Sequence, residues 1–178
     1  MTKPGDNAPS AEATEVWISN RQRCRPIKSV IIRRLAEAIL HKLSATGEIG
    51  IHLVSPSCSA SVNWQYLQHA GSTDVITFDH GSTSGHLHGE LFICVADAVD
   101  QARNFRTTWQ QELVRYVIHG LLHLCGFDDQ EPVKRRRMKR AEHRLVRWWE
   151  NGTGAASLDV ASRTVPRRRR RRKTSIRG

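Results

Sequence analysis

Alternating apolar and polar positions predict the strands of this chain. In residues 48–54, Ile49, Ile51 and Leu53 share one face and the residues between them share the other, as in a half-buried strand. We predict three further strands over residues 15–20, 72–78 and 86–95. The polar segment 79–85 separates the last two, and its composition predicts a hairpin or a crossing loop.

Apolar residues at spacings of three and four predict helices. Over residues 26–44, Val30, Ile31, Leu35 and Ile39 recur at helical spacing. Further helices are predicted over 62–68, 96–103, 107–124 and 133–149. The helix over 107–124 has the most regular pattern, with Thr107 or Thr108 as its cap. Helices that separate the first three strands and follow the fourth predict an α/β (α+β) fold, a mixed sheet layered with helices.

One folded domain is expected over residues 14–151 of the 178. Residues 1–13 are rich in Pro, Gly, Ala and Ser, which predicts a disordered N-terminus, and residues 152–178 are expected to form a linker and an arm. No apolar run approaches the ~18 residues that span a membrane. The N-terminus also lacks the apolar segment of a secretory signal, so we expect a cytoplasmic protein without a membrane partner.

The net charge of +11 is concentrated at the C-terminus. Residues 163–178 contain nine of the 28 Lys and Arg and no acid, which leaves 19 basic against 17 acidic residues elsewhere. Such a block repels itself into an extended arm, and its expected partner is a polyanion such as RNA. The predicted nucleic-acid-binding residues are Arg167, Arg168, Arg169, Arg170, Arg171, Arg172 and Lys173.

The segment HGLLHLCGFDD, residues 119–129, combines three side chains that bind metals. Positions four apart on a helix lie about 40° from each other around the axis, so His119 and His123 project from one face. Gly126 allows the chain to leave the helix in the left-handed conformation, and the exit can bring Asp129 back towards the imidazoles. The intervening leucines fit a buried helix. The spacing therefore predicts a metal site, in preference to a solvated pair of histidines.

Two histidines and one aspartate suit Zn²⁺, with one ion per chain and a fourth position left for water. The spacing H-x-x-x-H-x-x-G-x-x-(H/D) is similar to that of extended zincin motifs, so the helix is expected to be zincin-like. Peptidases of the HExxH type carry a glutamate after the first histidine as general base. Gly120 occupies that position here, which disfavours a metallopeptidase.

The same segment resembles the signature of the bacterial YbeY family, the endoribonucleases of rRNA maturation, whose usual form is HGxLHLxGYDH. Further segments resemble family motifs in the right order: Asn63, TDVITF at 73–78, GEL at 89–91, and Met138 with Glu142. The resemblance covers residues 15–147. One departure lies at Asp129, where the family usually has histidine.

The resemblance implies a single α/β domain in which the metal helix lies beside a four-stranded sheet. It implies a Zn²⁺-dependent, single-strand-specific endoribonuclease that acts in 16S rRNA 3′-end processing and ribosome biogenesis. The implied partners are rRNA, other single-stranded RNA and the small ribosomal subunit. The implied metal ligands are His119, His123 and, as a competent substitute, Asp129.

The proton-transferring group is left open by the sequence. Asp74 could orient a ligand histidine through a hydrogen bond, or it could cap the end of its strand. Glu90 could move a proton if its strand lines the cleft, or it could be an exposed strand residue. Because no general base is assigned, the alternative function is a ribosome-associated assembly factor whose metal is mainly structural.

Overall fold

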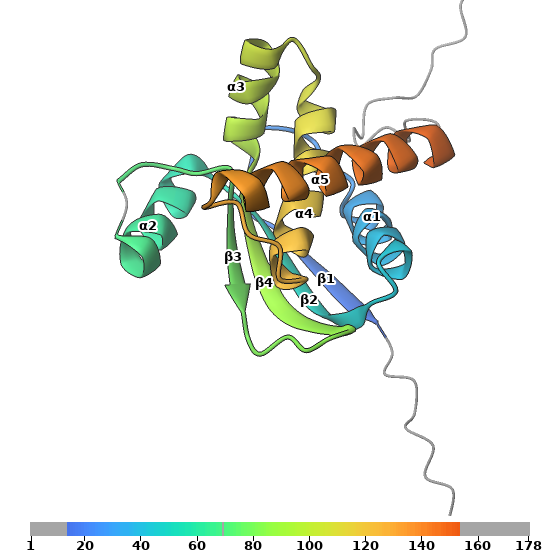
Figure 1. Cartoon of the computed structure of the whole chain (residues 1–178). Coiled ribbons are helices and arrows are strands. Elements are labelled where there is room, and N and C mark those ends of the chain that lie inside the picture. Colours follow the sequence, from blue (N-terminus) through green and yellow to red (C-terminus); the bar gives the residue numbers. More distant parts are fainter. Residues whose placement is uncertain (1–13, 69, 154–178) are drawn as a thin grey trace, which may run out of the picture.

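A four-stranded mixed sheet forms one layer of the molecule (Figure 1). The computed structural model describes residues 14–68 and 70–153. The strands are β1 (Glu15–Asn20), β2 (Thr46–Val54), β3 (Val75–Asp79) and β4 (His86–Cys94), in the spatial order β1-β2-β4-β3. β2 is parallel to both β1 and β4, and β3 lies antiparallel to β4 at the edge. The α/β class and the mixed sheet predicted from the sequence are confirmed.

Five helices accompany the sheet in the described part of the chain: α1 (Ser29–Lys42), α2 (Pro56–Leu67), α3 (Val95–Phe105), α4 (Trp109–Leu124) and α5 (Pro132–Thr153). α1 packs on β1 and β2, whereas α4 packs on β3 and β4. α3 and α5 both pack on α4, and α5 crosses it as an outer layer (Figure 1). None of the described helices combines the length and the apolar character that crossing a membrane requires.

Close contact between α4 and β4 depends on two glycines. A Cβ atom on Gly120 would lie 2.7 Å from Leu91 Cδ2, and one on Gly89 would lie 2.7 Å from Leu124 Cδ2. Real Cβ atoms do not approach carbon this closely, so both positions require the absence of a side chain. The helix that carries the two histidines is thereby held tightly against the sheet.

Side chains that bind the backbone explain two differences from the predicted boundaries. α2 starts at Pro56, six residues before the predicted helix, because the Ser55 hydroxyl accepts an N–H of the first turn and proline suits that turn. β3 starts at Val75, later than predicted, because Thr73 is held by α2. The Ser59 hydroxyl accepts from Thr73 N–H at 3.3 Å and donates to its carbonyl at 3.1 Å.

Candidate metal centre

Both ends of α4 are fixed by local sequence. Thr108 is the cap, forming a capping box with Gln111, and this decides between the two predicted threonines. At the other end Gly126 has φ +79°, and its N–H donates to the His123 carbonyl at 2.8 Å. Phe127 N–H then reaches back to the last turn of the helix at 3.0 Å, which completes a Schellman motif. This exit directs the chain from His123 towards Asp129.

The three predicted ligands come together. His119 Nε2 and His123 Nε2 lie 3.1 Å apart. Asp129 Oδ2 lies 3.7 Å from the first of these nitrogens, and Asp129 Oδ1 lies 4.0 Å from the second. The side chains retain 21%, 29% and 41% of their surface exposed, in sequence order, so solvent reaches the group. Within the described residues this is the cluster whose ligand atoms could hold a metal ion.

The outer nitrogens of both rings have acceptors. His119 Nδ1 lies 3.0 Å from Glu142 Oε2, and His123 Nδ1 lies 3.1 Å from the Phe127 carbonyl oxygen. A carbonyl can only accept, so Nδ1 of His123 carries the proton and Nε2 of the neutral ring presents a lone pair. The Glu142 carboxylate beside Nδ1 of His119 likewise favours a proton on Nδ1 and a lone pair on Nε2 of that ring. Two nitrogen lone pairs facing each other at 3.1 Å repel unless a proton or a metal cation lies between them.

These distances fit a tetrahedral zinc ion. Zn–N and Zn–O bonds of about 2.0–2.2 Å place neighbouring ligand atoms roughly 3.3–3.6 Å apart. The observed separations of 3.1, 3.7 and 4.0 Å bracket that range. Three protein ligands with solvent access leave a fourth position for water or substrate. The residues present are therefore suited to a divalent cation with an open coordination site.

Glu142 controls the charge of this centre. Its Oε1 accepts from Arg115 Nη1 at 2.7 Å while its Oε2 faces His119. Burial acts to raise the pKa of the Glu142 carboxyl, but the hydrogen bonds from His119 and Arg115 outweigh it and hold that pKa below its usual value. Glu142 is therefore a buried carboxylate, the kind of outer partner that orients a ligand histidine and increases its basicity.

The two histidines differ electrostatically. Burial acts to lower the pKa of His119, but the hydrogen bond and charge of Glu142 outweigh it and raise that pKa. Burial and then the charge of His119 lower the pKa of His123. The His123 ring is thus neutral near pH 7, as a metal ligand must be.

Comparisons with known proteins identify relatives of this chain. The sequence model of the family described as "Endoribonuclease YbeY" matches residues 17–150. The chain belongs to the YbeY endoribonuclease family. A relative from Chlorobium luteolum, named endoribonuclease YbeY, is 35% identical over 132 residues, which is 72% of this chain and 93% of that protein.

Other members of the YbeY family are similar over a shorter region. The endoribonuclease YbeY of Parabacteroides distasonis is 43% identical over 102 residues, or 57% of this chain and 70% of that protein.

The solution structure of TM1509 from Thermotoga maritima matches the fold with a TM-score of 0.55 and 25% sequence identity. That match covers 80% of this chain and 96% of the other.

Asp74 lies near the candidate ligand group but forms no hydrogen bond or ion pair with the two histidines. Its Oδ1 accepts from Val75 N–H at 2.9 Å and from the Thr73 hydroxyl at 3.0 Å, so it caps the start of β3. Its charge is nevertheless close enough to contribute to the raised pKa of His119, after burial and Glu142. Since Glu142 and the Phe127 carbonyl occupy both Nδ1 atoms, Asp74 does not have the orienting role predicted as one of its alternatives.

Glu90 is not brought to the centre. Its neighbour Leu91 faces α4, so Glu90 projects from the opposite face of the sheet. There its oxygens lie 3.1 Å from His52 Nε2 and 3.4 Å from His80 Nε2. Because alternate residues of a strand face opposite sides of the sheet, Glu90 does not line the cleft, and the alternative in which it moves a proton is wrong. The predicted arm residues 167–173 lie outside the described residues.

Two charged residues beside the centre could not be assigned a role from the sequence. Glu142 enters only through the family resemblance, and no sequence pattern marks Arg115. The available signal for Glu142 was an acidic residue on the buried stripe of an otherwise basic helix, where a charge needs a partner. Arg115 supplies it, and Glu112 also contacts Arg115 at 3.4 Å.

Proposed function

We propose that this chain is a Zn²⁺-dependent, single-strand-specific endoribonuclease with one ion per chain. We further propose that it acts in the cytoplasm on 16S rRNA during 3′-end processing and ribosome biogenesis, in association with the small ribosomal subunit. Membership of the YbeY family supports the reaction class. The observation that carries the proposal is the convergence of His119, His123 and Asp129 with both outer ring nitrogens already occupied.

His119, His123 and Asp129 would hold the ion. When bound, Zn²⁺ supplies Lewis-acid chemistry, which makes water more acidic and stabilises negative charge on a phosphoryl group. Glu142 and the Phe127 carbonyl fix the tautomers of the two rings, so that their Nε2 lone pairs point to one place. The protein thus contributes preorganised ligands on a rigid helix, and no ring has to reorient during the reaction.

Asp74 is our candidate for the group that accepts a proton from the attacking water. Its charge acts on His119, and it also lines an open hollow with Asp97 and Asp100, which none of the three ligands lines. A carboxylate in this position can act as general base once substrate is present, because catalytic hydrogen bonds often form only in that complex.

A metallopeptidase mechanism has no support from the site. The position that would hold its glutamate is Gly120, where even a Cβ atom would lie 2.7 Å from Leu91 Cδ2. A glutamate there would have to displace the packing of α4 on β4. The close packing of α4 on β4 therefore explains why glycine occupies this position in place of the glutamate of a peptidase.

One observation favours the second function, an assembly factor with a mainly structural metal. Asp129 lies in the segment between α4 and α5, and Glu142 of α5 contacts His119 of α4. A cation bound by the three ligands would fasten the segment that leads into α5 to the end of α4, as structural zinc fastens a loop.

Cleavage of single-stranded RNA by the full-length zinc-loaded protein, compared with His123→Ala, separates the two functions. We expect the variant to lose at least about 10³-fold in rate while its thermal unfolding stays cooperative. Val133→Ala, an exposed position at the start of α5, serves as the matched control and should retain full activity. Cleavage equal in wild type and His123→Ala would reject a catalytic metal, and loss of cooperative unfolding would favour the structural one.

We also propose that the polybasic arm, including Arg167–Arg172 and Lys173, contacts rRNA phosphates. Deleting residues 163–178 removes nine positive charges. We expect weaker RNA binding with a smaller salt dependence and an unchanged zinc content. Equal binding by the truncated and full-length proteins at low and moderate salt would reject this role.

A further inference from the structure

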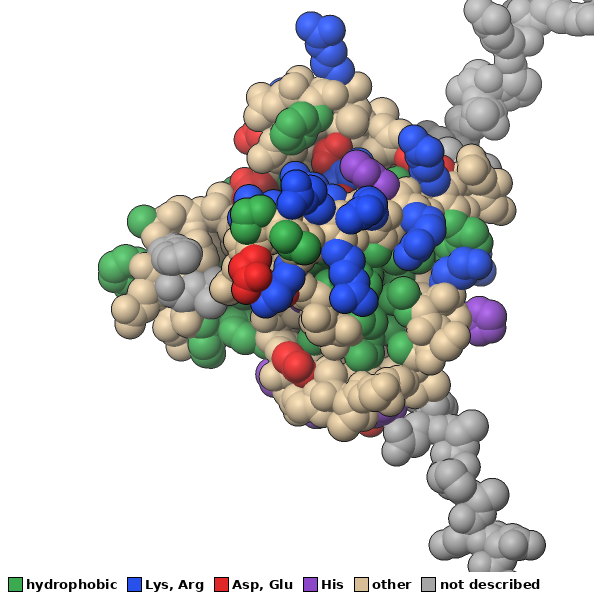
Figure 2. All heavy atoms as spheres, viewed as in Figure 1, with side chains coloured by type: hydrophobic (Ala, Val, Ile, Leu, Met, Phe, Trp, Pro, Cys, Tyr) green, Lys and Arg blue, Asp and Glu red, His purple; other side chains and the backbone are tan. Residues whose placement is uncertain are grey.

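Four arginines form a line on the outward face of α5, and we refer to Arg136, Arg140, Arg144 and Arg147 as the basic stripe. Their spacing of four, four and three residues keeps them within roughly 80° around the helix axis. All four are exposed. Buried residues of the same helix occupy the opposite face: Met138, Ala141, Glu142, Leu145, Val146 and Trp149. Figure 2 shows Lys and Arg side chains gathered over α5 on the face that it draws.

The basic stripe has no acidic partner within residues 14–68 and 70–153. None of the ion pairs found there includes any of the four arginines. By contrast, Lys134, earlier on the helix, is paired with Asp128 at 3.1 Å and Glu131 at 2.9 Å. α5 contains eight Lys and Arg but only two Glu. Glu142 is buried and bound to Arg115, and Glu150 accepts from a glutamine of α4. A linear array of unpaired positive charges attracts a polyanion.

The stripe starts beside the metal centre. Arg135, one residue before it, donates from Nε to the carbonyl of the ligand Asp129 at 2.7 Å. Arg137, one residue after its start, places its guanidinium 5.5 Å from the centre of the Phe127 ring. From Arg136 to Arg147 the helix then extends roughly 17 Å. An open hollow on the surface, lined by His143 with three stripe arginines, lies along this path.

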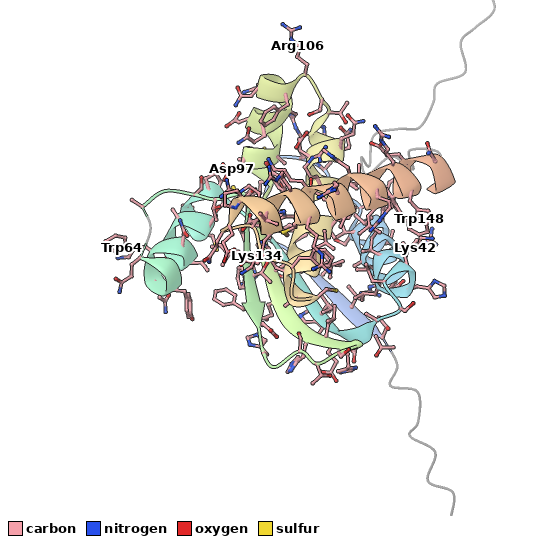
Figure 3. All side chains as sticks on the ribbon, viewed as in Figure 1. Lys42, Trp64, Asp97, Arg106, Lys134 and Trp148 are labelled. Atoms are coloured by element: carbon pink, nitrogen blue, oxygen red, sulfur yellow. The ribbon has the colours of Figure 1, made fainter. Side chains whose placement is uncertain are left out.

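The other end of the helix continues the positive surface. Lys42 of α1 lies over the Trp148 ring, with Nζ 5.4 Å from its centre, and Figure 3 shows the two side chains together. Trp148 is 37% exposed, so the surface here combines arginines, a lysine and an aromatic ring. Positive grooves with interleaved aromatic rings are a feature of proteins that bind single-stranded nucleic acid.

We propose that the basic stripe binds the phosphates of single-stranded RNA outside the metal centre, so that α5 guides the strand on one side of the scissile bond. This inference rests on the proposed function and specifies where its substrate lies. An anionic membrane surface is disfavoured because a helix that lies on a membrane needs a free apolar face. The apolar face of α5 is buried in the core.

The test is equilibrium binding of a fluorescent single-stranded RNA of about 12 nucleotides, followed by anisotropy with the full-length protein in EDTA. In EDTA the RNA is not consumed, so binding is measured apart from cleavage. Arg140→Gln/Arg144→Gln removes the middle of the stripe. Arg33→Gln/Arg34→Gln is the matched control, because it removes two exposed arginines from α1 and the same charge.

We expect the stripe variant to bind about tenfold more weakly at low salt and the control less than about twofold more weakly. Two lost phosphate contacts should reduce the slope of log affinity against log salt by about 1.4. Circular dichroism should show the same melting temperature for both variants and the wild type. Equal affinity and equal salt slope for stripe and control variants would overturn the proposal.

A cleavage assay on the same proteins distinguishes failure of this inference from failure of the proposed function. With zinc present, the stripe variant should show a raised KM and an unchanged kcat. A wild type that binds RNA through the stripe but does not cleave it would reject the nuclease and keep the stripe. A wild type that cleaves, with identical KM in the stripe and control variants, would reject the stripe and keep the nuclease.

Discussion

Charged side chains on the inward and outward faces of α5 have opposite environments. On the inward face Glu142 is buried and contacts both Arg115 and His119. On the outward face the basic stripe is exposed, and no ion pair within the described residues includes it. A buried charge without a partner is strongly destabilising, whereas an exposed arginine stays hydrated at little cost. The difference indicates that the inward charges hold His119, a candidate metal ligand, in place, whereas the outward charges remain available for a partner.

The largest effect is expected from Asp74→Asn. This variant tests whether the chemistry depends on residues near the metal centre and not on the basic stripe. If Asp74 accepts the proton, kcat should fall by about 10²–10⁴ because the amide cannot do so. RNA affinity in EDTA should stay within about twofold, since the stripe is untouched. Asp100→Asn, which lines the same hollow, is the control. A kcat close to that of the wild type would remove Asp74 from the mechanism.

Glu142→Gln should weaken zinc binding by about 10–100-fold, measured by competition with a chromophoric chelator. The amide no longer provides the negative charge that raises the pKa of His119 and that pairs with Arg115. Glu150→Gln, two turns further along the same helix, should bind zinc like the wild type. Equal zinc affinity in both variants would contradict the role assigned to the inward face.

Arg144→Gln should show the reverse pattern. Zinc affinity should be unchanged, and the free energy of unfolding in urea should change by less than about 0.5 kcal/mol, because the side chain is exposed and unpaired. The salt slope of RNA binding should fall by about 0.7, one phosphate contact. A loss of zinc affinity in this variant would show that the two faces of α5 are not independent.

The smallest effect is expected at Glu90, which lies on the open face of the sheet between two histidines. Burial acts to raise the pKa of Glu90, but hydrogen bonds from His52 and His80 outweigh it and lower that pKa. A carboxyl whose folded-state pKa is lowered stabilises the protein above its unfolded pKa and loses that contribution as pH falls through the folded value. As the pH falls from near 7 to near 4, the free energy of unfolding should therefore decrease less in Glu90→Gln than in the wild type, by a difference of less than about 1 kcal/mol.

Urea unfolding near pH 7 and near pH 4 measures this difference, with Glu48→Gln on the exposed part of β2 as the control. Cleavage should be unaffected by Glu90→Gln, since the residue and α4 lie on opposite sides of the sheet. A loss of kcat comparable to that of Asp74→Asn would contradict this placement.

The convergence of the candidate metal ligands could be predicted from the sequence because they are local. His119, His123 and Asp129 lie within eleven residues, and a helix followed by glycine leaves few arrangements open. Strand alternation and helical spacing likewise predicted every strand and helix that the structure describes, with boundary differences where serine and threonine side chains bind the backbone.

Long-range relations were harder to predict. Glu142 reaches His119 only because α5 folds back over α4, and the contact joins residues 23 positions apart. The side of the sheet on which Glu90 lies depends on where α4 packs, which alternation alone does not give. The basic residues of α5 were visible as a charge-rich helix, but the stripe became distinct only when its buried face and its missing ion pairs were known.

Titration of the metal-free, full-length protein with Zn²⁺, with the initial rate of single-stranded RNA cleavage as the readout, tests the central claim most directly. If His119, His123 and Asp129 form one catalytic site, the rate should rise linearly and reach a plateau at one equivalent of zinc per chain. A full cleavage rate in the metal-free protein, or zinc bound at one equivalent without any rise in rate, would contradict it.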